Sequence, residues 1–259
     1  IVCTPDYITQ VMGKSYDEID WPTVATGADY CDELVDIPGG GTEKRFTCNG
    51  QVFSTETHRD NLQALLGSCG GRYTWKGGKF FLYPSMYVSP DVSITDDDIT
   101  GSVQVRTGPQ REQRYNSVRA VFYDPANDYQ FTESPEISSS TYITRDAGDI
   151  LYKDLRLYFS NSSTQAQRVQ FADLLQSDLP TLVTIPVGML GFKVAVGDTV
   201  QVTYADLGWS SAVFRCVGWN WDAEEGIKLT LREEDANAYI DLDVGDYQTG
   251  GSINEIDTP

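Results

Sequence analysis

Short segments of strict alternation between apolar and polar residues constrain the fold of this chain more than any other feature. In residues 199–204 and again in 227–232, every second residue is apolar and its neighbours are polar. Successive side chains of a strand point to opposite faces, so this pattern predicts half-buried antiparallel strands. Weaker alternation marks 103–105 and 118–122. Such strands, with Gly-Asp turns between them, favour a closed or sandwich-like β domain over a parallel α/β sheet.

The N-terminal third follows a different period. Val24, Ala28, Cys31 and Val35 recur at helical spacing, which predicts that residues 1–43 form a helical segment and a glycine-rich linker.

Residues 44–95 are expected to form a small α+β module. Its helix has an apolar stripe at 62–69, begins at a Thr57 cap with Asp60 and stops at Gly70, and Gly77–Gly78 marks a two-residue hairpin. The one histidine, His58, is expected to be exposed in the first turn of this helix.

The remaining residues complete the predicted organisation. Residues 96–245 are expected to form a β-barrel-like domain interrupted by one helix at about 162–178. Ser162 and Gln165 have the spacing of a capping box for this helix, and Ala166, Val169, Ala172 and Leu175 form its apolar stripe. Residues 246–259 are polar and are expected to be a tail or linker. The predicted class is mainly β with an α+β insertion.

The chain is strongly acidic. It has 38 Asp and Glu against 19 Lys and Arg, a formal charge of −19 in 259 residues. Nucleic acids and anionic bilayers bind to surfaces with clustered Lys and Arg, so neither is expected to bind the general surface of this chain. With 40% hydrophobic and 12% aromatic residues, the chain is nevertheless too apolar for an acidic disordered tail. No segment approaches the ~20 apolar residues of a membrane span.

Few residues are suited to catalysis. A single histidine and five cysteines without repeated spacing favour neither a nucleophile–histidine pair nor a thiolate zinc site. Carboxylates such as Glu224, Glu225, Glu233 and Glu234 could serve a glycosidase, but so acidic a chain places some pair at a suitable distance in any fold. The Asp96–Asp98 run could ligate Ca²⁺ or simply form a turn. No catalytic, cofactor or metal residue is therefore assigned.

Three tryptophans are the candidate ligand or interface residues. Trp209, Trp219 and Trp221 could stack on sugar rings. If the segment 213–221 is one regular strand, Trp219 and Trp221 share a face with Val213 and Val217, which favours packing in a core or an interface.

A further set of segments is spread over roughly residues 20–245. The order of these segments along the chain resembles that in a known protein family. The segments are Ala28–Asp32, Phe46–Gly50, Asn61–Leu66, Cys69–Gly71, Gly78–Pro84, Arg114–Val118, Phe122–Pro125, Ala166–Arg168, Gly197–Val200 and Leu229–Glu234. In this order they resemble the hub region of phage tail-tip proteins, which are similar to the tip attachment (host specificity) protein of lambda-like siphophages, prophages and gene transfer agents.

The resemblance implies baseplate-hub-like β-barrel domains in a homotrimer that closes the tail tube, contacts other tail-tip and tube proteins, and connects the tube to the receptor-binding fibre. It carries over no catalytic residue and implies no enzyme and no cofactor. The chain begins at Ile1 without a methionine, which suggests a fragment. Such a piece would lack the fibre part that contacts the host receptor, and would belong to the virion tail tip assembled in the bacterial host cytoplasm.

The charge agrees with this interpretation. An acidic channel repels phosphates, so DNA would pass through during ejection without binding. Because acidic copies also repel one another, subunit contacts are expected to be aromatic and apolar, or bridged by Arg111, Arg114 or Arg119. Three alternatives stay open: a carbohydrate-binding adhesin module, a tail-associated glycosidase, and an acidic β protein without a partner.

Overall fold

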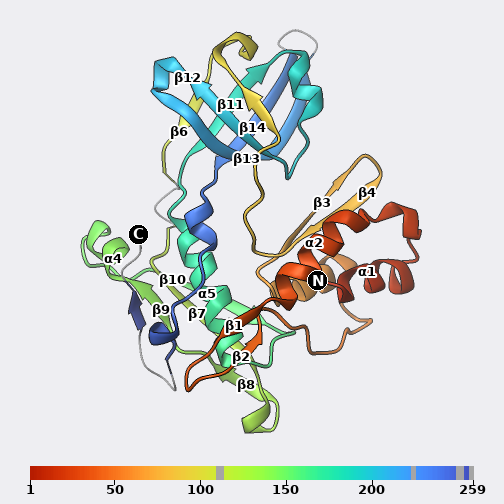
Figure 1. The fold of residues 1–259 in the computed structure, drawn as a ribbon, viewed down its shortest axis with the longest axis vertical. Helices are drawn as coiled ribbons and strands as arrows, with labels where there is room; N and C mark the ends of the chain where they lie inside the picture. The colour runs from red at the N-terminus through yellow and green to blue at the C-terminus, as the bar shows by residue number, and fades with distance from the viewer. Residues whose placement is uncertain (109–113, 223–225, 249–253, 257–259) are drawn as a thin grey trace. The chain divides into compact units, whose positions relative to one another are not determined.

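The computed structural model describes residues 1–108, 114–222 and 226–248, together with the backbone of 254–256. The chain forms two compact units that are interleaved along the sequence (Figure 1). Unit 1 consists of 1–86, 115–177 and the described residues from Tyr239 on, and unit 2 consists of 87–114 and 178–238. The four consecutive ranges expected from the sequence do not describe this grouping.

A five-stranded sheet lies at the centre of unit 1. Its strand order is β10-β7-β9-β15, and β8 also pairs with β7. The central strand β7 runs parallel to β10 and antiparallel to β8 and β9. The strands are β7 (Ser117–Asp124), β8 (Gln130–Glu133), β9 (Ile137–Ser139), β10 (Tyr152–Leu157) and β15 (Asn254–Ile256), and the short helix α4 (Ser140–Arg145) follows β9.

Helix α5 (Ser163–Ser177) packs on this sheet and confirms the helix predicted at about 162–178. The Ser162 hydroxyl accepts from the Gln165 amide at 3.2 Å, so the predicted cap is present. Ala166 and Val169 of the predicted apolar stripe pack with Ala120, Phe122 and Leu157 in one core cluster. Unexpectedly, the polar side of α5 is buried too, including Gln165, Gln167, Arg168 and Gln170.

The buried polar side chains of α5 join the distant segments of unit 1. Gln165 bonds to the backbone of Thr47 and Ser68, and Gln170 donates to the carbonyls of Val118 and Pro135. These bonds satisfy groups that would otherwise be costly to bury. The Gln165 side chain is therefore used in tertiary contacts and does not complete the capping box.

Unit 1 has a second core cluster, which includes Ile8, Ile19, Leu62 and Leu82, and further helices and strands. They are α1 (Cys3–Asp6), the π-helix η1 (Tyr7–Val11), α2 (Trp21–Asp32), β1 (Leu34–Asp36), β2 (Thr42–Lys44), α3 (His58–Gly67), β3 (Arg72–Lys76) and β4 (Lys79–Tyr83).

Most of the predicted local signals of unit 1 are confirmed. The Thr57 hydroxyl accepts from the Asp60 amide at 3.2 Å and caps α3. Gly77 and Gly78 have φ of 57° and 81° in the β3–β4 turn, as a type I′ hairpin requires. The predicted N-terminal helix extends too far at its C-terminal end. Helix α2 ends at Asp32, and Val35 lies in strand β1.

Unit 2 is built on a six-stranded sheet of order β5-β12-β13-β14-β11-β6. The strands are β5 (Val92–Ile94), β6 (Gln104–Arg106), β11 (Leu182–Val187), β12 (Thr199–Tyr204), β13 (Trp209–Asp222) and β14 (Gly226–Glu233). All neighbours pair antiparallel except β5 and β12. The alternation predicted in 199–204 and 227–232 is confirmed, because Val200, Val202, Leu229 and Leu231 are fully buried.

The predicted barrel is not what the structure shows. Among the described strands, β5 and β6 are edges of an open sheet and do not pair with each other. The chain as a whole is a mixed α/β structure and not mainly β. Short 3₁₀ helices complete it: η2 (Tyr16–Glu18), η3 (Asp96–Asp98), η5 (Pro125–Asn127), η6 (Met189–Lys193), η7 (Ala205–Leu207), η8 (Ala236–Tyr239) and η9 (Val244–Asp246).

Candidate functional site

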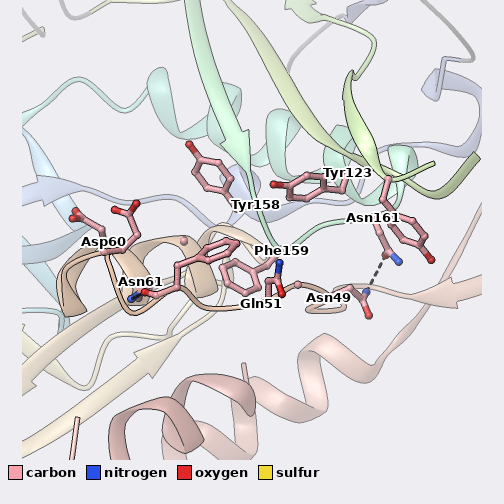
Figure 2. A pocket seen from close by; sticks show the side chains of 13 residues that line it. Asn49, Gln51, Asp60, Asn61, Tyr123, Tyr158, Phe159 and Asn161 are labelled. Carbon is pink, nitrogen blue, oxygen red and sulfur yellow. Dashed lines mark hydrogen bonds between the residues drawn. The ribbon is translucent and has the colours of Figure 1, made fainter. Parts of the chain in front are cut away.

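A pocket of about 820 Å³ opens on unit 1 (Figure 2). Its lining comes from three regions that are distant in the sequence: the segment before α3 with α3 itself, the β7–β8 turn, and the segment that follows β10. In Figure 2, Asp60 and Asn61 lie at one end, Asn49 and Asn161 lie at the other, and Tyr158 and Tyr123 lie between. The lining residues are Asn49, Gly50, Gln51, Phe53, Glu56, Asp60, Asn61, Ala64, Tyr123, Tyr129, Tyr158, Phe159 and Asn161.

Aromatic rings form much of the wall and rim. Tyr123 stacks on Phe131 with ring centroids 4.1 Å apart, and Phe131 meets Tyr158 edge-on at 5.7 Å. Tyr129 is 62% exposed at the tip of the β7–β8 turn, where its φ is 56°. The Asp124 carboxylate stabilises this turn by accepting a hydrogen bond from the Ala126 amide at 2.9 Å.

Side-chain amides supply most of the polar groups. Asn49 donates to the Asn161 carbonyl oxygen at 2.9 Å and to the Thr47 hydroxyl at 3.0 Å. Asn61 donates to the Tyr7 hydroxyl at 3.1 Å and to the Phe53 carbonyl at 3.2 Å. These hydrogen bonds fix the orientation of the Asn49 and Asn61 side-chain amides.

The charged lining groups are carboxylates. Glu56 and Asp60 line the pocket, and no Lys, Arg or His is among its described lining residues. Asp60 accepts from the Thr57 hydroxyl at 2.6 Å and so also stabilises the start of α3. The described lining thus offers aromatic faces, side-chain amides and two carboxylates for contact with a ligand.

Sequence reasoning missed this pocket. Its residues lie in three segments that no short motif connects. Two local signals could have directed attention to it: a tyrosine in the Asp124–Tyr129 turn, where an aromatic side chain has no core to enter, and the Tyr158–Asn161 segment, where aromatic and amide residues follow a strand directly.

The three predicted tryptophans do not form one platform. Trp209 begins β13 and packs near Phe214, with ring centroids 5.0 Å apart. Trp219 lies ten residues further along the same strand, which at ~3.3 Å per residue places it about 30 Å away. Trp209 therefore cannot share a small ligand with Trp219 or Trp221.

The predicted face of Trp219 and Trp221 is wrong. The β13–β14 register shifts between Cys216 and Gly218, so Trp219 lies opposite Leu229 and Trp221 opposite Ile227. Directly opposed residues share a face. The bulge thus moves both tryptophans away from the face of Val213 and onto the face of the buried core.

Both tryptophans nevertheless remain accessible, and Trp219 lies next to η6, which carries exposed apolar residues. Trp219 donates to the Gly191 carbonyl at 2.9 Å, and its ring lies 6.1 Å from that of Phe192 in η6. Met189 is 80% exposed, Phe192 and Trp221 are 59% exposed, and Trp219 is 38% exposed. We call these four residues the η6 patch.

The acidic candidates have structural partners. Glu234 is buried and pairs with Arg215 at 2.9 Å, and Glu233 accepts from the Thr181 amide at 3.2 Å. Glu224 and Glu225 lie outside the described residues. Glu233 and Glu234 are thus engaged in contacts within the chain.

The Asp96–Asp98 run forms η3. Asp98 accepts from the Thr95 amide at 2.9 Å, and Asp96 accepts from the Ala205 amide at 3.2 Å. The run is thus used in a turn, and no cluster of three or more His, Cys, Asp or Glu among the described residues is arranged to hold a metal ion.

The basic candidates for subunit contacts differ in their surroundings. Arg119 is bonded within its own chain, to Glu136 at 3.1 Å, and its guanidinium lies 3.4 Å from the centre of the Tyr152 ring. Arg114 is also engaged within the chain. Arg111 lies outside the described residues.

His58 and the cysteines complete the candidates. His58 is exposed, with Nδ1 2.8 Å from the Tyr7 hydroxyl. All five cysteines are free. A hydrogen bond from Cys69 lowers the pKa of Cys31 to about 7, and burial raises the pKa of Cys216 to about 11. None of the helices in the described part of the chain combines the length and the apolar run that a membrane crossing needs.

Comparison with protein families gives one match. The profile of a family described as "Putative phage tail protein" matches residues 57–217, which is more than half of the chain. This range begins just before α3 and ends within β13. No curated protein sequence matches.

Comparison with solved structures gives further likenesses. A chain of the virion of a native gene transfer agent particle is 14% identical with a TM-score of 0.61, over 79% of this chain and 44% of that one. A 43 kDa tail protein of prophage MuSo2 from Shewanella oneidensis is 14% identical (TM-score 0.48; 73% and 58% covered). Prophage tail protein gp18 from Listeria monocytogenes EGD-e is 13% identical (TM-score 0.39; 77% and 58% covered). The chain thus spans about half the length of these relatives.

Proposed function

This chain belongs to the phage tail protein family whose profile covers residues 57–217, and we propose that it forms a trimeric hub at the tail tip. In this role three copies surround the DNA channel and connect the tail tube to the receptor-binding fibre. The observation that carries the proposal is the family match. The fold shared with a chain of a gene transfer agent particle supports it.

The η6 patch is the proposed contact between copies. Trp219, Trp221, Phe192 and Met189 are large apolar residues on the surface of unit 2. Exposed apolar surface of this kind is typical of protein–protein contacts, and aromatic residues and Met are enriched in them. Trp209 packs near Phe214 and is not part of this contact.

The charge supports the proposed channel. A net charge of −19 per copy gives three copies a field that repels phosphate groups within a Debye length of ~8–10 Å. A channel lined by such a surface lets a polyanion pass without holding it. Arg119 is paired with Glu136 inside its own chain and adds little attraction for DNA.

Antibody labelling of purified particles followed by electron microscopy tests the proposed location. Label concentrated at the tail end distal to the capsid supports a hub at the tip. Label on the capsid or spread along the tube contradicts it.

The contact is tested separately by native mass spectrometry of the purified chain and of two variants. The proposal predicts a trimer for the native chain and loss of the trimer in Trp221→Ser. A Tyr16→Ser variant is the control, because Tyr16 is equally accessible but lies in unit 1, stacked on Trp21 at 4.1 Å. A trimer that survives Trp221→Ser would exclude the η6 patch as the contact.

A further inference from the structure

We propose that the pocket of unit 1 binds a neutral saccharide. This inference goes beyond the tail-hub role and does not depend on it, because it concerns a site within one copy of the chain. The site combines exposed aromatic rings, fixed side-chain amides and a lining without cations.

The aromatic groups offer flat apolar faces. Tyr129 is 62% exposed, Phe53 is 54% exposed and Tyr158 is 38% exposed. Rings of this kind pack against the apolar C–H face of a pyranose and keep a polar edge towards water. The stack of Tyr123 on Phe131 and the edge contact of Phe131 with Tyr158 fix the rings of Tyr123 and Tyr158 before any ligand binds.

The amides offer matched hydrogen-bond groups. Asn49 uses its amino group to bond Asn161 and Thr47, so its carbonyl oxygen is left as an acceptor. Asn161 uses its carbonyl oxygen in the same pair, so its amino group is left as a donor. A sugar hydroxyl both donates and accepts, and it can therefore bond to both groups of this pair. A phosphate can only accept and an ammonium group can only donate.

The lining charge excludes acidic ligands. Glu56 and Asp60 are the charged groups among the described lining residues. A carboxylate or phosphate on the ligand would meet these two negative charges without a compensating cation. The saccharide is therefore expected to be neutral.

The pocket is formed in advance and has a suitable size. Its volume of about 820 Å³ lies within the ~300–1,000 Å³ of small-molecule sites. Gly50 contributes to its wall, where an added Cβ would lie 2.7 Å from the Phe159 ring. Asn61 is held by Tyr7 and by the Phe53 carbonyl.

Saturation-transfer difference NMR with lactose, maltose and diacetylchitobiose as neutral probes tests the proposal, with sialyllactose as the anionic probe. At least one neutral disaccharide is expected to bind, and sialyllactose is expected to bind more weakly than lactose. Tyr129→Ala should raise Kd about tenfold through the lost stacking surface. Asn161→Asp keeps the acceptor for Asn49, removes the free donor and should also weaken binding.

Tyr16→Ala is the matched control for Tyr129→Ala, because both tyrosines are 62% exposed and Tyr16 lies outside the pocket. Circular dichroism checks that each variant is folded. The absence of binding to every neutral probe, equal binding by all variants, or preferred binding of sialyllactose would each overturn the proposal. None of these outcomes concerns the location of the chain in a particle, so the tail-hub role is tested independently.

Discussion

Arg168 shows how single residues hold unit 1 together. Its side chain is 3% exposed and pairs with Glu43 at 2.7 Å. It also donates to the Arg45 carbonyl at 2.9 Å and to the Tyr247 hydroxyl at 3.1 Å. One guanidinium thus joins α5 to the β2 region and to the segment near the C-terminal end of the described chain. A planar donor with five N–H groups is suited to such a position.

Arg168→Ala is expected to lower the free energy of unfolding by about 3–5 kcal/mol, because it leaves Glu43 and a backbone carbonyl without their buried partner. Lys44→Ala is the control. Lys44 pairs with Asp32 at 2.8 Å, but both side chains are more than half exposed, so its loss should cost less than ~1 kcal/mol. Urea denaturation measures both values. Similar costs for the two variants would contradict this account.

Burial of Tyr30 and Cys216 predicts a loss of stability at alkaline pH. Burial raises the pKa of Tyr30 from 10.0 to about 12 and that of Cys216 from 9.0 to about 11. Between these values the unfolded chain loses protons that the folded chain keeps. The stabilisation of the folded state by these two protonated groups is therefore complete below pH 9.0 and disappears as pH rises towards about 12.

Urea midpoints across this pH window measure the effect. Cys216→Ala should flatten the part between pH 9.0 and about 11, and Tyr30→Phe the part between 10.0 and about 12. A midpoint that rises with pH in this window would show that the linkage has the opposite sign.

At the residue scale, local signals were predictable and tertiary partners were not. The Thr57 cap and the Gly77–Gly78 turn depend on neighbours in the sequence and were recognised. The burial of Gln165 depends on Thr47 and Ser68, more than ninety residues away, and polar residues on a helix usually face water. The pocket tyrosines and asparagines were missed for the same reason.

In unit 2, the position of the 3₁₀ helix η6 depends on close packing of its backbone against neighbouring side chains. Gly191 in η6 is the clearest case, because an added Cβ would lie 2.7 Å from Ile227 and 2.8 Å from Val187. The Gly191 carbonyl also accepts from Trp219. The position of η6, and with it the η6 patch, therefore depends on the absence of a side chain at residue 191.

Gly191→Ala is expected to cost about 1–3 kcal/mol through overpacking and to change the tryptophan fluorescence of the folded protein as η6 shifts. Gly67→Ala in α3 is the control, because no atom lies within 4 Å of its added Cβ and helices favour Ala over Gly. Thermal unfolding and emission spectra give the two readouts. A fluorescence spectrum unchanged by Gly191→Ala would show that η6 does not position Trp219.

At the element scale, periodicity predicted strands and helices better than their arrangement. The alternation in β12 and β14 was sufficient to identify both strands. The bulge between Cys216 and Gly218 was not predictable, because one extra residue in β13 leaves the local pattern intact and changes only the register. The open edges of the sheet depend on the pairing of distant strands, which periodicity does not encode.

At the scale of the whole molecule, repulsion between acidic copies opposes the proposed trimer, and apolar contact between the copies favours it. Each copy carries −19, so assembly of three copies brings like charges together. The η6 patch supplies apolar contact that salt does not weaken. The proposed oligomerisation is therefore expected to depend on the ionic strength of the solution.

The proposed trimer should become more stable as salt rises from about 0.05 to about 0.5 M NaCl, because the Debye length falls from about 14 to about 4 Å in this range. Sedimentation equilibrium at several concentrations measures the association constant. Association that weakens with salt would point to contacts made by ion pairs.

The family match supports a role in a phage tail. The proposed role at the tip further specifies where the chain lies in the particle and how many copies assemble there. A cryo-electron microscopy reconstruction of a particle that contains this chain tests both most directly. The account predicts three copies around the tail axis at the tip, with carboxylates facing the channel and the η6 patch buried between copies. Copies away from the axis, a number other than three, or a channel lined by Lys and Arg would contradict it.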